Sequence, residues 1–373
     1  MTIDSLHGES LNMILDSLPD GVYITDLERK ILYWNKSAEK ITGWTKEDVR
    51  GTSCYDGILC HVDSGDNLLC GKDDCPLHQA IINNQSNRLP VMVFAKGKQG
   101  QRIPVEVTVA PVVDENGDVV GGIESFRDLS SLMDDLQHAR SIQLNAMETD
   151  IADDPRIQIA VHNIPYEYVS GDFYRVERLT DDSYVMFMAD IMGHGVSSAL
   201  YAMTIRSIWE EARGLLSNPA AFCTHLNEQL FKMTKSDDSF ATAVFGIFDL
   251  SKMKFNFVRA GHPPPLLHRN GSVVPCGKSN QALGLFLDGD FIADEIDLQL
   301  GDRFLVYTDG AIEITNSEGE ELEMDGLAKI MLNEQKNISG SEFIKKMETR
   351  ILEYSNLMTF SDDLTLAEIV IKP

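Results

Sequence analysis

The order of hydrophobic and polar positions between residues 11 and 126 predicts a mixed unit of strands and helices. A helix-like stretch at Lys36–Thr42 follows the first two predicted strands. Asp114-Glu115-Asn116-Gly117-Asp118 is a strong hairpin turn between the last two strands. The alternating stretches that predict strands are Val22–Asp26, Ile31–Asn35, Leu89–Ala95, Arg102–Val113 and Val119–Arg127.

Residues 128–149 have a different pattern, which predicts an amphipathic helix. Apolar positions recur at a spacing of three and four residues through Leu129, Leu132, Leu136 and Ala139, and Gln143 and Ala146 continue the series. Two interpretations stay open, because about three heptads fit: the helix packs on its own domain, or it forms a two-stranded seam with a second copy. Asp150 to Pro155 then breaks the helix.

The pattern between residues 156 and 373 predicts many strands with helices grouped between them, which indicates an α+β fold. The predicted strands are Ile157–Val161, Phe173–Leu179, Tyr184–Ala189, Thr242–Phe248, Lys254–Arg259, Phe304–Thr308 and Leu364–Ile371. The predicted helices are Val196–Leu215, Pro219–Thr234, Gly326–Leu332 and Ser341–Tyr354.

Composition and charge exclude several classes of function. The 373 residues have a formal net charge of −26, so a nucleic-acid backbone or an anionic membrane surface would repel the chain. No apolar run is long enough to span a bilayer, and Met1 to Ser10 lack the features of a signal peptide. We therefore expect a cytoplasmic protein that binds neither nucleic acid nor membrane, whose six cysteines are not structural disulfides.

Four aspartates stand at the ends of predicted strands beside small residues. They are Asp172 in Ser170-Gly171-Asp172-Phe173-Tyr174, Asp190 before Ile191-Met192-Gly193-His194-Gly195, Asp309 in Thr308-Asp309-Gly310, and Asp362 of the pair Asp362-Asp363. A single Asp-Gly is usually just a turn. Four such carboxylates together favour a shared site for Mg²⁺ or Mn²⁺, which prefer oxygen ligands.

These segments, in this order, resemble the PPM-type metal-dependent serine/threonine phosphatases, and most closely the stage II sporulation E (SpoIIE) branch. The resemblance covers about residues 139–373. Further matching segments are Ala139-Arg140-Ser141-Ile142-Gln143, Phe240-Ala241-Thr242-Ala243, Ala260-Gly261-His262-Pro263-Pro264-Pro265 and Ala282-Leu283-Gly284-Leu285. The fold that it implies is a β-sandwich flanked by helices.

The resemblance also implies a two-metal hydrolysis mechanism with Asp190 and Asp172 as catalytic residues. Asp190 would bridge two Mn²⁺ or Mg²⁺ ions, and the backbone carbonyl of Ile191 would bind one of them. Asp309 and Asp362 would hold the other, and Asp172 would bind metal directly or through water. Two such ions activate a water as the attacking hydroxide.

Two histidines are additional candidates near these motifs. His194 lies beside the proposed site, where it could protonate the leaving group or contact substrate. The alternative is that a hydrogen bond in a turn accounts for it, and we favour that alternative. His262, in a proline-rich turn, is interpreted as structural.

Residues 11–126 resemble a PAS domain in Leu18-Pro19-Asp20-Gly21-Val22, Ile31–Ala38, Ile41-Thr42-Gly43-Trp44 and the closing strand that ends at Arg127-Asp128. The resemblance implies an antiparallel sheet with helices. The ligand of this domain is unknown. Its weak candidate residues are Cys54, Cys60, Cys70 and Cys75, with His61 and His78 nearby. Their spacing is not that of a zinc ribbon. A metal, haem or iron–sulfur site, a redox-sensing thiol pair, and cysteines that merely pack in the core all stay open.

The sequence thus predicts a PAS sensor domain at 1–127, a helical linker at 128–150 and a SpoIIE-type phosphatase domain at 151–373. The expected function is a PAS-regulated phosphoserine/phosphothreonine protein phosphatase, whose linker helix gates the catalytic site. The resemblance implies a phosphorylated STAS-domain protein as substrate, in a partner-switching pathway. A homodimer through the PAS domain and linker is expected. The alternative is a non-catalytic signalling scaffold that binds the same partner.

Overall fold

The structure is a computed structural model that describes residues 8–63, 65–71, 75–87, 90–147, 154–233, 239–334, 338–355 and 360–372. The chain divides into two compact units, Met1–Leu136 (unit 1) and Gln137–Pro373 (unit 2). The boundaries expected from the sequence, at 127/128 and 150/151, stay a prediction. The end of the expected linker (148–150), the start of the expected phosphatase domain (151–153), Leu89 and Thr234 lie outside the described residues.

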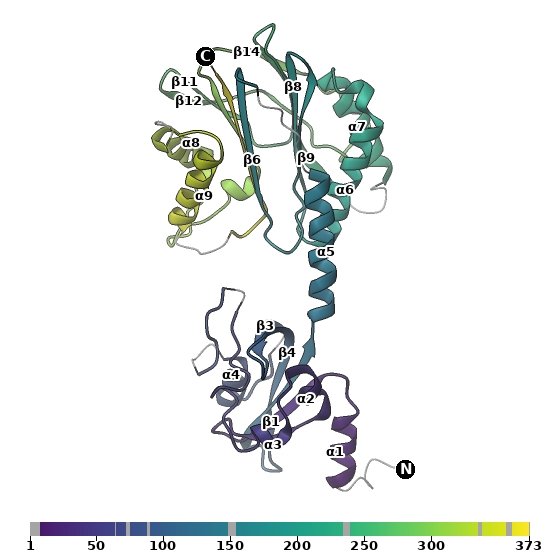
Figure 1. Ribbon diagram of the computed structural model, residues 1–373, viewed down its shortest axis with the longest axis vertical. Coiled ribbons are helices and arrows are strands. Elements are labelled where there is room, and N and C mark those ends of the chain that lie inside the picture. Colours follow the sequence, from purple (N-terminus) through teal and green to yellow (C-terminus); the bar gives the residue numbers. More distant parts are fainter. Residues whose placement is uncertain are drawn as a thin grey trace. The chain divides into compact units, whose positions relative to one another are not determined.

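Unit 1 is built on an antiparallel sheet with the strand order β2-β1-β5-β4-β3 (Figure 1). Its strands are β1 (Gly21–Thr25), β2 (Ile31–Trp34), β3 (Val91–Lys96), β4 (Arg102–Val113) and β5 (Val119–Asp128). Its described helices are α1 (Gly8–Asp16), α2 (Lys36–Thr42), α3 (Lys46–Val49) and α4 (Pro76–Asn83). The antiparallel sheet with helices is the arrangement that the sequence predicted for this half.

A buried asparagine connects the start of this sheet to helix α2. Asn35 caps the helix, since its Oδ1 accepts hydrogen bonds from the backbone N–H groups of Val22 (2.9 Å) and Ala38 (2.8 Å). Its Nδ2 donates to the carbonyls of Leu15 (2.9 Å) and Asp20 (3.0 Å). Every polar group of the Asn35 side chain therefore has a partner, which makes its burial tolerable.

Helix α5 (Ser130–Met147) follows β5 directly along the chain. Leu132 is 50% exposed and Ala139 is also exposed, whereas Gln143 and Met147 are buried within unit 2. The last turn therefore packs on its own unit. A seam with a second copy through the earlier positions stays a prediction.

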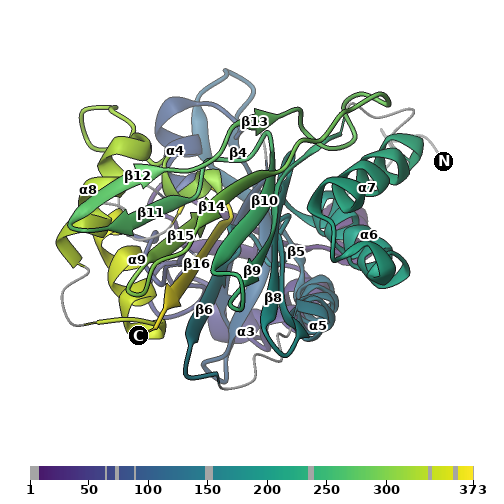
Figure 2. The same cartoon turned by 90° about the horizontal axis from the view of Figure 1, so that it is seen from above.

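Unit 2 is a sandwich of two mainly antiparallel sheets covered by helices on both outer faces (Figures 1 and 2). The first sheet has the order β13-β10-β9-β8-β7, with β14 also pairing with β10, and the second has the order β12-β11-β15-β16-β6. Helices α6 (Val196–Glu211) and α7 (Pro219–Met233) cover the first sheet, and α8 (Glu323–Glu334) and α9 (Ser341–Ser355) cover the second. The helix-flanked β-sandwich expected from the sequence is confirmed.

The strands of the two sheets of unit 2 enclose an apolar layer. The first sheet contains β7 (Phe173–Thr180), β8 (Ser183–Ile191), β9 (Ala241–Asp249), β10 (Lys254–Ala260), β13 (Ser279–Asn280) and β14 (Asp294–Asp297). The second contains β6 (Ile157–Ile164), β11 (Leu266–Arg269), β12 (Ser272–Pro275), β15 (Arg303–Tyr307) and β16 (Leu364–Ile371). Apolar side chains of both sheets, such as Phe255 and Phe304 with ring centroids 5.3 Å apart, form the layer between them.

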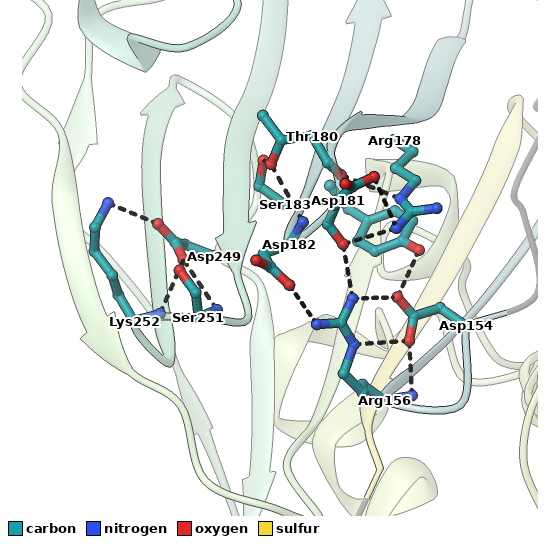
Figure 3. A network of polar contacts seen from close by, with 11 residues as sticks. Asp154, Arg156, Arg178, Thr180, Asp181, Asp182, Ser183, Asp249, Ser251 and Lys252 are labelled. Carbon is teal, nitrogen blue, oxygen red and sulfur yellow. Dashed lines mark hydrogen bonds and ion pairs between the residues drawn. The ribbon is translucent and has the colours of Figure 1, made fainter.

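An ion-pair network closes the end of the sandwich at which β7 turns into β8 (Figure 3). Arg156, just before β6, donates to the carboxylates of Asp154 (2.7 Å) and Asp182 and to the carbonyl of Asp181 (2.7 Å). The hydroxyl of Tyr184 also donates to Asp154 (2.9 Å). This network joins the two sheets at one end of the sandwich. The carboxylates described below lie at the opposite end, where β7 begins and β8 ends.

Several parts of unit 2 differ from the sequence prediction: β13 and β14 were not predicted, and α8 begins at Glu323 rather than at Gly326. The helix predicted at Val196–Leu215 ends at Glu211 and is followed by a turn of 3₁₀ helix at Arg213–Leu215, around the weak helix former Gly214. The β11–β12 hairpin was not predicted, although Asn270-Gly271 is a strong hairpin signal and both residues have positive φ. Among the described helices, none is long and apolar enough to cross a membrane.

Candidate metal centre

The four aspartates singled out by the sequence come from both sheets of unit 2. Asp172 directly precedes β7, and Asp190 is the second-to-last residue of β8. Because Phe173 of β7 pairs with Ala189 of β8, the two aspartates lie side by side. Asp309 follows β15 and Asp362 precedes β16, the neighbouring strand of the second sheet. Strand ends of both sheets thus bring the four carboxylates into one acidic cluster.

Asp172 is the most tightly held member of the cluster. Its side chain is buried, and its Oδ2 accepts hydrogen bonds from the hydroxyls of Thr308 (3.0 Å) and Thr365 (2.6 Å) of the other sheet. Burial, and after it the charge of Asp363, raises the pKa of Asp172 well above its usual range. Its Oδ1 is also buried and has no hydrogen-bond partner among the described residues. A buried oxygen without a protein partner is a strong candidate to bind a metal ion or a water molecule.

The carboxylates of the cluster repel one another. Burial and the charges of Asp172, Asp309 and Asp362 raise the pKa of Asp190 to about 9. The pKa of Asp309 is also raised, by burial and by Asp362, and its carboxyl group shares a hydrogen bond with that of Asp190. Like charges held this close need protons or cations to offset them.

Asp362 and Asp363 are adjacent but have different surroundings. Both oxygens of the buried Asp363 accept backbone hydrogen bonds, Oδ1 from Tyr166 (2.7 Å) and Oδ2 from Gly171 (2.6 Å). The half-buried Asp362 accepts a bond from the N–H of Asp363 (2.7 Å). Asp363 therefore ties the loop before β7 to the start of β16, whereas Asp362 has an oxygen to offer to a ligand.

Gly310 allows this close approach of the loops. A Cβ at this position would lie 2.2 Å from the backbone carbonyl oxygen of Asp363, which is far inside van der Waals contact. The Asp309-Gly310 pair thus allows the turn after β15 to pack directly against the loop that contains Asp362 and Asp363.

The oxygen atoms available in the cluster are of the kind that binds a divalent cation. Carboxylates and the backbone carbonyl of Ile191, at the end of β8, are the oxygen ligands that Mg²⁺ and Mn²⁺ prefer. In the ranges that the structure describes, no three His, Cys, Asp or Glu side chains are grouped closely enough to hold an ion as they stand. Asp190 and Asp309 are hydrogen-bonded, and Asp172 and Asp362 act on Asp190 through their charge.

Sequence reasoning did not identify the residues that position Asp172. Thr308 and Thr365 flank the predicted motifs, and their β-branched side chains signalled only strands. Ser170 accepts the N–H of Asp172 on its Oγ (3.1 Å), and the buried Gln143 of α5 bonds both to the N–H of Ser170 (3.0 Å) and to its carbonyl (2.6 Å). The sequence marked Gln143 as a polar residue at an apolar position of the helix and as the end of the matching segment Ala139-Arg140-Ser141-Ile142-Gln143, but neither signal pointed to Ser170.

The two histidines differ in their environments. Nδ1 of the exposed His194 lies 2.6 Å from Oε1 of Glu167, and the ring makes an edge contact with Tyr166, with centroids 5.2 Å apart. His262 is fully buried, and its Nδ1 shares a hydrogen bond with the hydroxyl of Thr242 (2.7 Å). Hydrogen bonds to residues distant in the chain hold both side chains, and the roles expected for them from the sequence stay predictions.

The candidate residues of unit 1 fall into two groups. Cys54, Cys70 and Cys75 are buried together with His61, and within the described residues they contribute to no compact metal-ligand set. Cys60 is partly exposed, and its thiol donates to the carbonyl of Tyr55 (3.6 Å). His78 lies in α4. All six cysteines of the chain are free thiols.

Family models match both units. The PAS domain model matches residues 19–131. The model for "Stage II sporulation protein E (SpoIIE)" matches residues 180–372, more than half of the chain. The chain belongs to the SpoIIE family. The SpoIIE match contains Asp190, Asp309 and Asp362, and Asp172 precedes its first residue.

The SpoIIE-family region is similar to two curated proteins of Bacillus subtilis. The phosphoserine phosphatase RsbP is 28% identical over 187 residues, which cover 49% of this chain and 46% of RsbP. The phosphoserine phosphatase RsbU is 22% identical over 234 residues, which cover 62% of this chain and 68% of RsbU. The chain thus matches less than half the length of RsbP.

A solved structure supports the fold assignment of the SpoIIE-family region. The SiaA-PP2C domain of Pseudomonas aeruginosa aligns with a TM-score of 0.56 at 22% identity, over 64% of this chain and 96% of that domain. Unit 2 therefore has the PP2C fold.

Proposed function

We propose that this protein is a PAS-regulated, divalent-metal-dependent phosphoserine/phosphothreonine protein phosphatase. The observation that supports it most is the acidic cluster, in which Asp172, Asp190, Asp309 and Asp362 come from the ends of four strands, and in which burial and neighbouring carboxylates raise the pKa of Asp172, Asp190 and Asp309. A cluster with this charge would repel a phosphate monoester by itself. It suits a phosphate substrate once divalent cations offset the carboxylates.

Each residue has a role that its surroundings support. Asp190, on which the charges of Asp172, Asp309 and Asp362 all act, would bind both of two ions, with the Ile191 carbonyl holding one of them and Asp309 and Asp362 the other. Asp172, fixed by two threonine hydroxyls, would direct its unpartnered Oδ1 to an ion or to a bound water. Two bound Mn²⁺ or Mg²⁺ ions would supply a nucleophilic hydroxide at neutral pH and stabilise the phosphoryl oxygens.

The substrate that we propose is a phosphorylated STAS-domain protein in a partner-switching pathway. The support is the similarity to RsbP and RsbU, both named phosphoserine phosphatases, and the join of a PAS domain to a SpoIIE-family region in one chain. We propose a cytoplasmic protein that binds neither membrane nor nucleic acid, in keeping with its net charge of −26. We also propose a homodimer through unit 1 and helix α5.

The proposed activity is tested by phosphate release from a STAS-domain protein phosphorylated on serine. We expect the full-length protein to release phosphate with Mn²⁺ or Mg²⁺ and to lose this activity when a chelator removes the ion. A phosphotyrosine peptide, measured in parallel, should be a poor substrate. If calorimetry shows that Mn²⁺ binds but no phosphoserine protein is hydrolysed, the result contradicts an enzyme and favours a scaffold that only binds the partner.

Regulation would reach the cluster through Gln143. This side chain is the described contact by which α5 holds the backbone of Ser170, two residues before Asp172. A rotation or shift of α5 would therefore move the loop that positions Asp172. We propose that a signal in the PAS domain alters activity along this route.

Replacing Gln143 with alanine is expected to lower activity by about 10-fold or more, because two buried hydrogen bonds worth about 1 kcal/mol each are lost at the Asp172 loop. The kinetic measurement is kcat and the Mn²⁺ concentration at half-maximal activity. Gln137→Ala, at an exposed position of the same helix, serves as the matched control. Unchanged kinetics in Gln143→Ala would contradict the proposed route.

A further inference from the structure

Two buried cysteines of unit 1 are in direct contact. Cys70 and Cys75 are 4% and 3% exposed, and their thiols are hydrogen-bonded to each other. The Cys70 sulfur also accepts a hydrogen bond from the backbone N–H of His61 (3.0 Å). Residues 65–68, shortly before Cys70 in the chain, are exposed.

The two thiols have unlike surroundings. Cys75 occupies the N-cap position of α4 without a side-chain capping hydrogen bond, and Pro76 is the first residue of the helix. The hydrogen bond with Cys70, the backbone N–H of His78 and the Arg29 guanidinium all lower the pKa of Cys75, against the effect of its burial. The same contact and burial raise the pKa of Cys70. One partner is thus favoured as the thiolate and the other as the thiol.

We propose that Cys70 and Cys75 form a reversible dithiol–disulfide site that reacts with hydroperoxides. The Cys75 thiolate attacks one peroxide oxygen and the O–O bond breaks, so Cys75 becomes a sulfenic acid. The other oxygen leaves as hydroxide or alkoxide and takes a proton from the solvent to give water or alcohol. Cys70 then gives up its proton and attacks that sulfur, which forms the S–S bond and releases water. The two sulfurs lose two electrons, and the peroxide gains them.

The same asymmetry makes the site reversible. A reducing thiol that attacks the Cys70 sulfur expels Cys75, and a stabilised thiolate is the better leaving group. The loop between the two cysteines is short, so closing it orders little additional chain. These features distinguish the pair from cysteines that only fill space in the core.

Oxidation changes the charge in the core of unit 1. The negative charge beside Arg29 is lost when Cys75 joins the disulfide. Glu124 of β5, which is buried and whose pKa is raised by burial and by Cys75, would also lose this neighbouring charge. Because β5 runs directly into α5 along the chain, the strand that precedes the linker helix would be the first to respond.

The test is peptide mapping of the full-length protein before and after treatment with hydrogen peroxide. Trypsin cleaves after Lys72, between the two cysteines, so a disulfide joins two otherwise separate peptides. The first of these, residues 51–72, also contains Cys54 and Cys60, so fragmentation of the linked pair must assign the bonded sulfur. We expect peroxide to remove two of the six free thiols and to link the peptide containing Cys70 to that containing Cys75. Dithiothreitol should restore both.

Variants distinguish this pair from other partners. Cys70→Ser and Cys75→Ser should each abolish the linked peptide, whereas Cys60→Ser and Cys54→Ser should retain it. A link from Cys75 to Cys54, or no link in the unaltered chain, would overturn the proposal. Elemental analysis of protein purified without oxygen is the second measurement: one metal ion per chain that both Cys70→Ser and Cys75→Ser lose would show a metal site instead. Neither readout depends on phosphatase activity.

Discussion

Replacing Asp190 with asparagine is expected to lower metal-dependent phosphate release by about 10³-fold, which corresponds to about 4 kcal/mol of transition-state stabilisation. Asparagine has nearly the same shape but cannot bridge two cations with a negative charge. The substitution also removes the group on which the repulsion from Asp172, Asp309 and Asp362 acts. The metal-free variant should therefore be no less stable than the unaltered protein, so lost activity cannot be attributed to unfolding.

The measurement is kcat with saturating Mn²⁺, together with the rise in melting temperature that Mn²⁺ causes. Both should fall in Asp190→Asn and persist in Asp181→Asn. Asp181 is the matched control because its side chain is fully exposed in the β7–β8 turn, at the other end of the sandwich (Figure 3). Retained activity in Asp190→Asn would exclude the proposed bridging role.

The sequence was sufficient to predict the strands that position the acidic cluster. Each of the four aspartates follows or precedes a run of apolar residues long enough to be a buried strand, and these runs became β7, β8, β15 and β16. The ends of buried strands can be predicted because each buried strand is a local run of apolar residues that stops where the strand ends. The order of the motifs then indicated the family, which the SpoIIE model confirmed.

The contacts that position the cluster could not be predicted, because they join residues far apart in the chain. Thr308 and Thr365 reach Asp172 from the opposite sheet, and no local pattern shows which strands of a sandwich face each other. Gln143 contacts Ser170 across the end of α5, where the helical pattern indicated a weak apolar position. Long-range hydrogen bonds of this kind depend on tertiary packing, which sequence periodicity does not encode.

The cysteines of unit 1 illustrate the same point. Their spacing left a metal site, a redox pair and simple packing open. The fold brings Cys70 and Cys75 into hydrogen-bond contact and leaves Cys60 partly exposed, a distinction that spacing alone does not contain.

Replacing Asp363 with alanine is expected to lower the free energy of unfolding of unit 2 by about 2–6 kcal/mol, because two backbone N–H groups lose their acceptor at about 1–3 kcal/mol each. These groups belong to Tyr166 and to the buried Gly171, and the second is adjacent to Asp172. Activity should fall as well, since the loop that positions Asp172 loses its attachment to β16. Urea denaturation of the metal-free protein measures the stability.

The neighbouring variant Asp362→Ala should also lose activity, but without the loss of stability. Asp362 accepts a bond from its own neighbour and faces the charges of Asp190 and Asp309, so its removal relieves repulsion and should leave the metal-free stability unchanged or higher. Phosphate release should nevertheless be lost with a proposed metal ligand. If Asp362→Ala instead unfolds the protein while Asp363→Ala stays folded and inactive, the two roles are reversed, and Asp363 is the ligand.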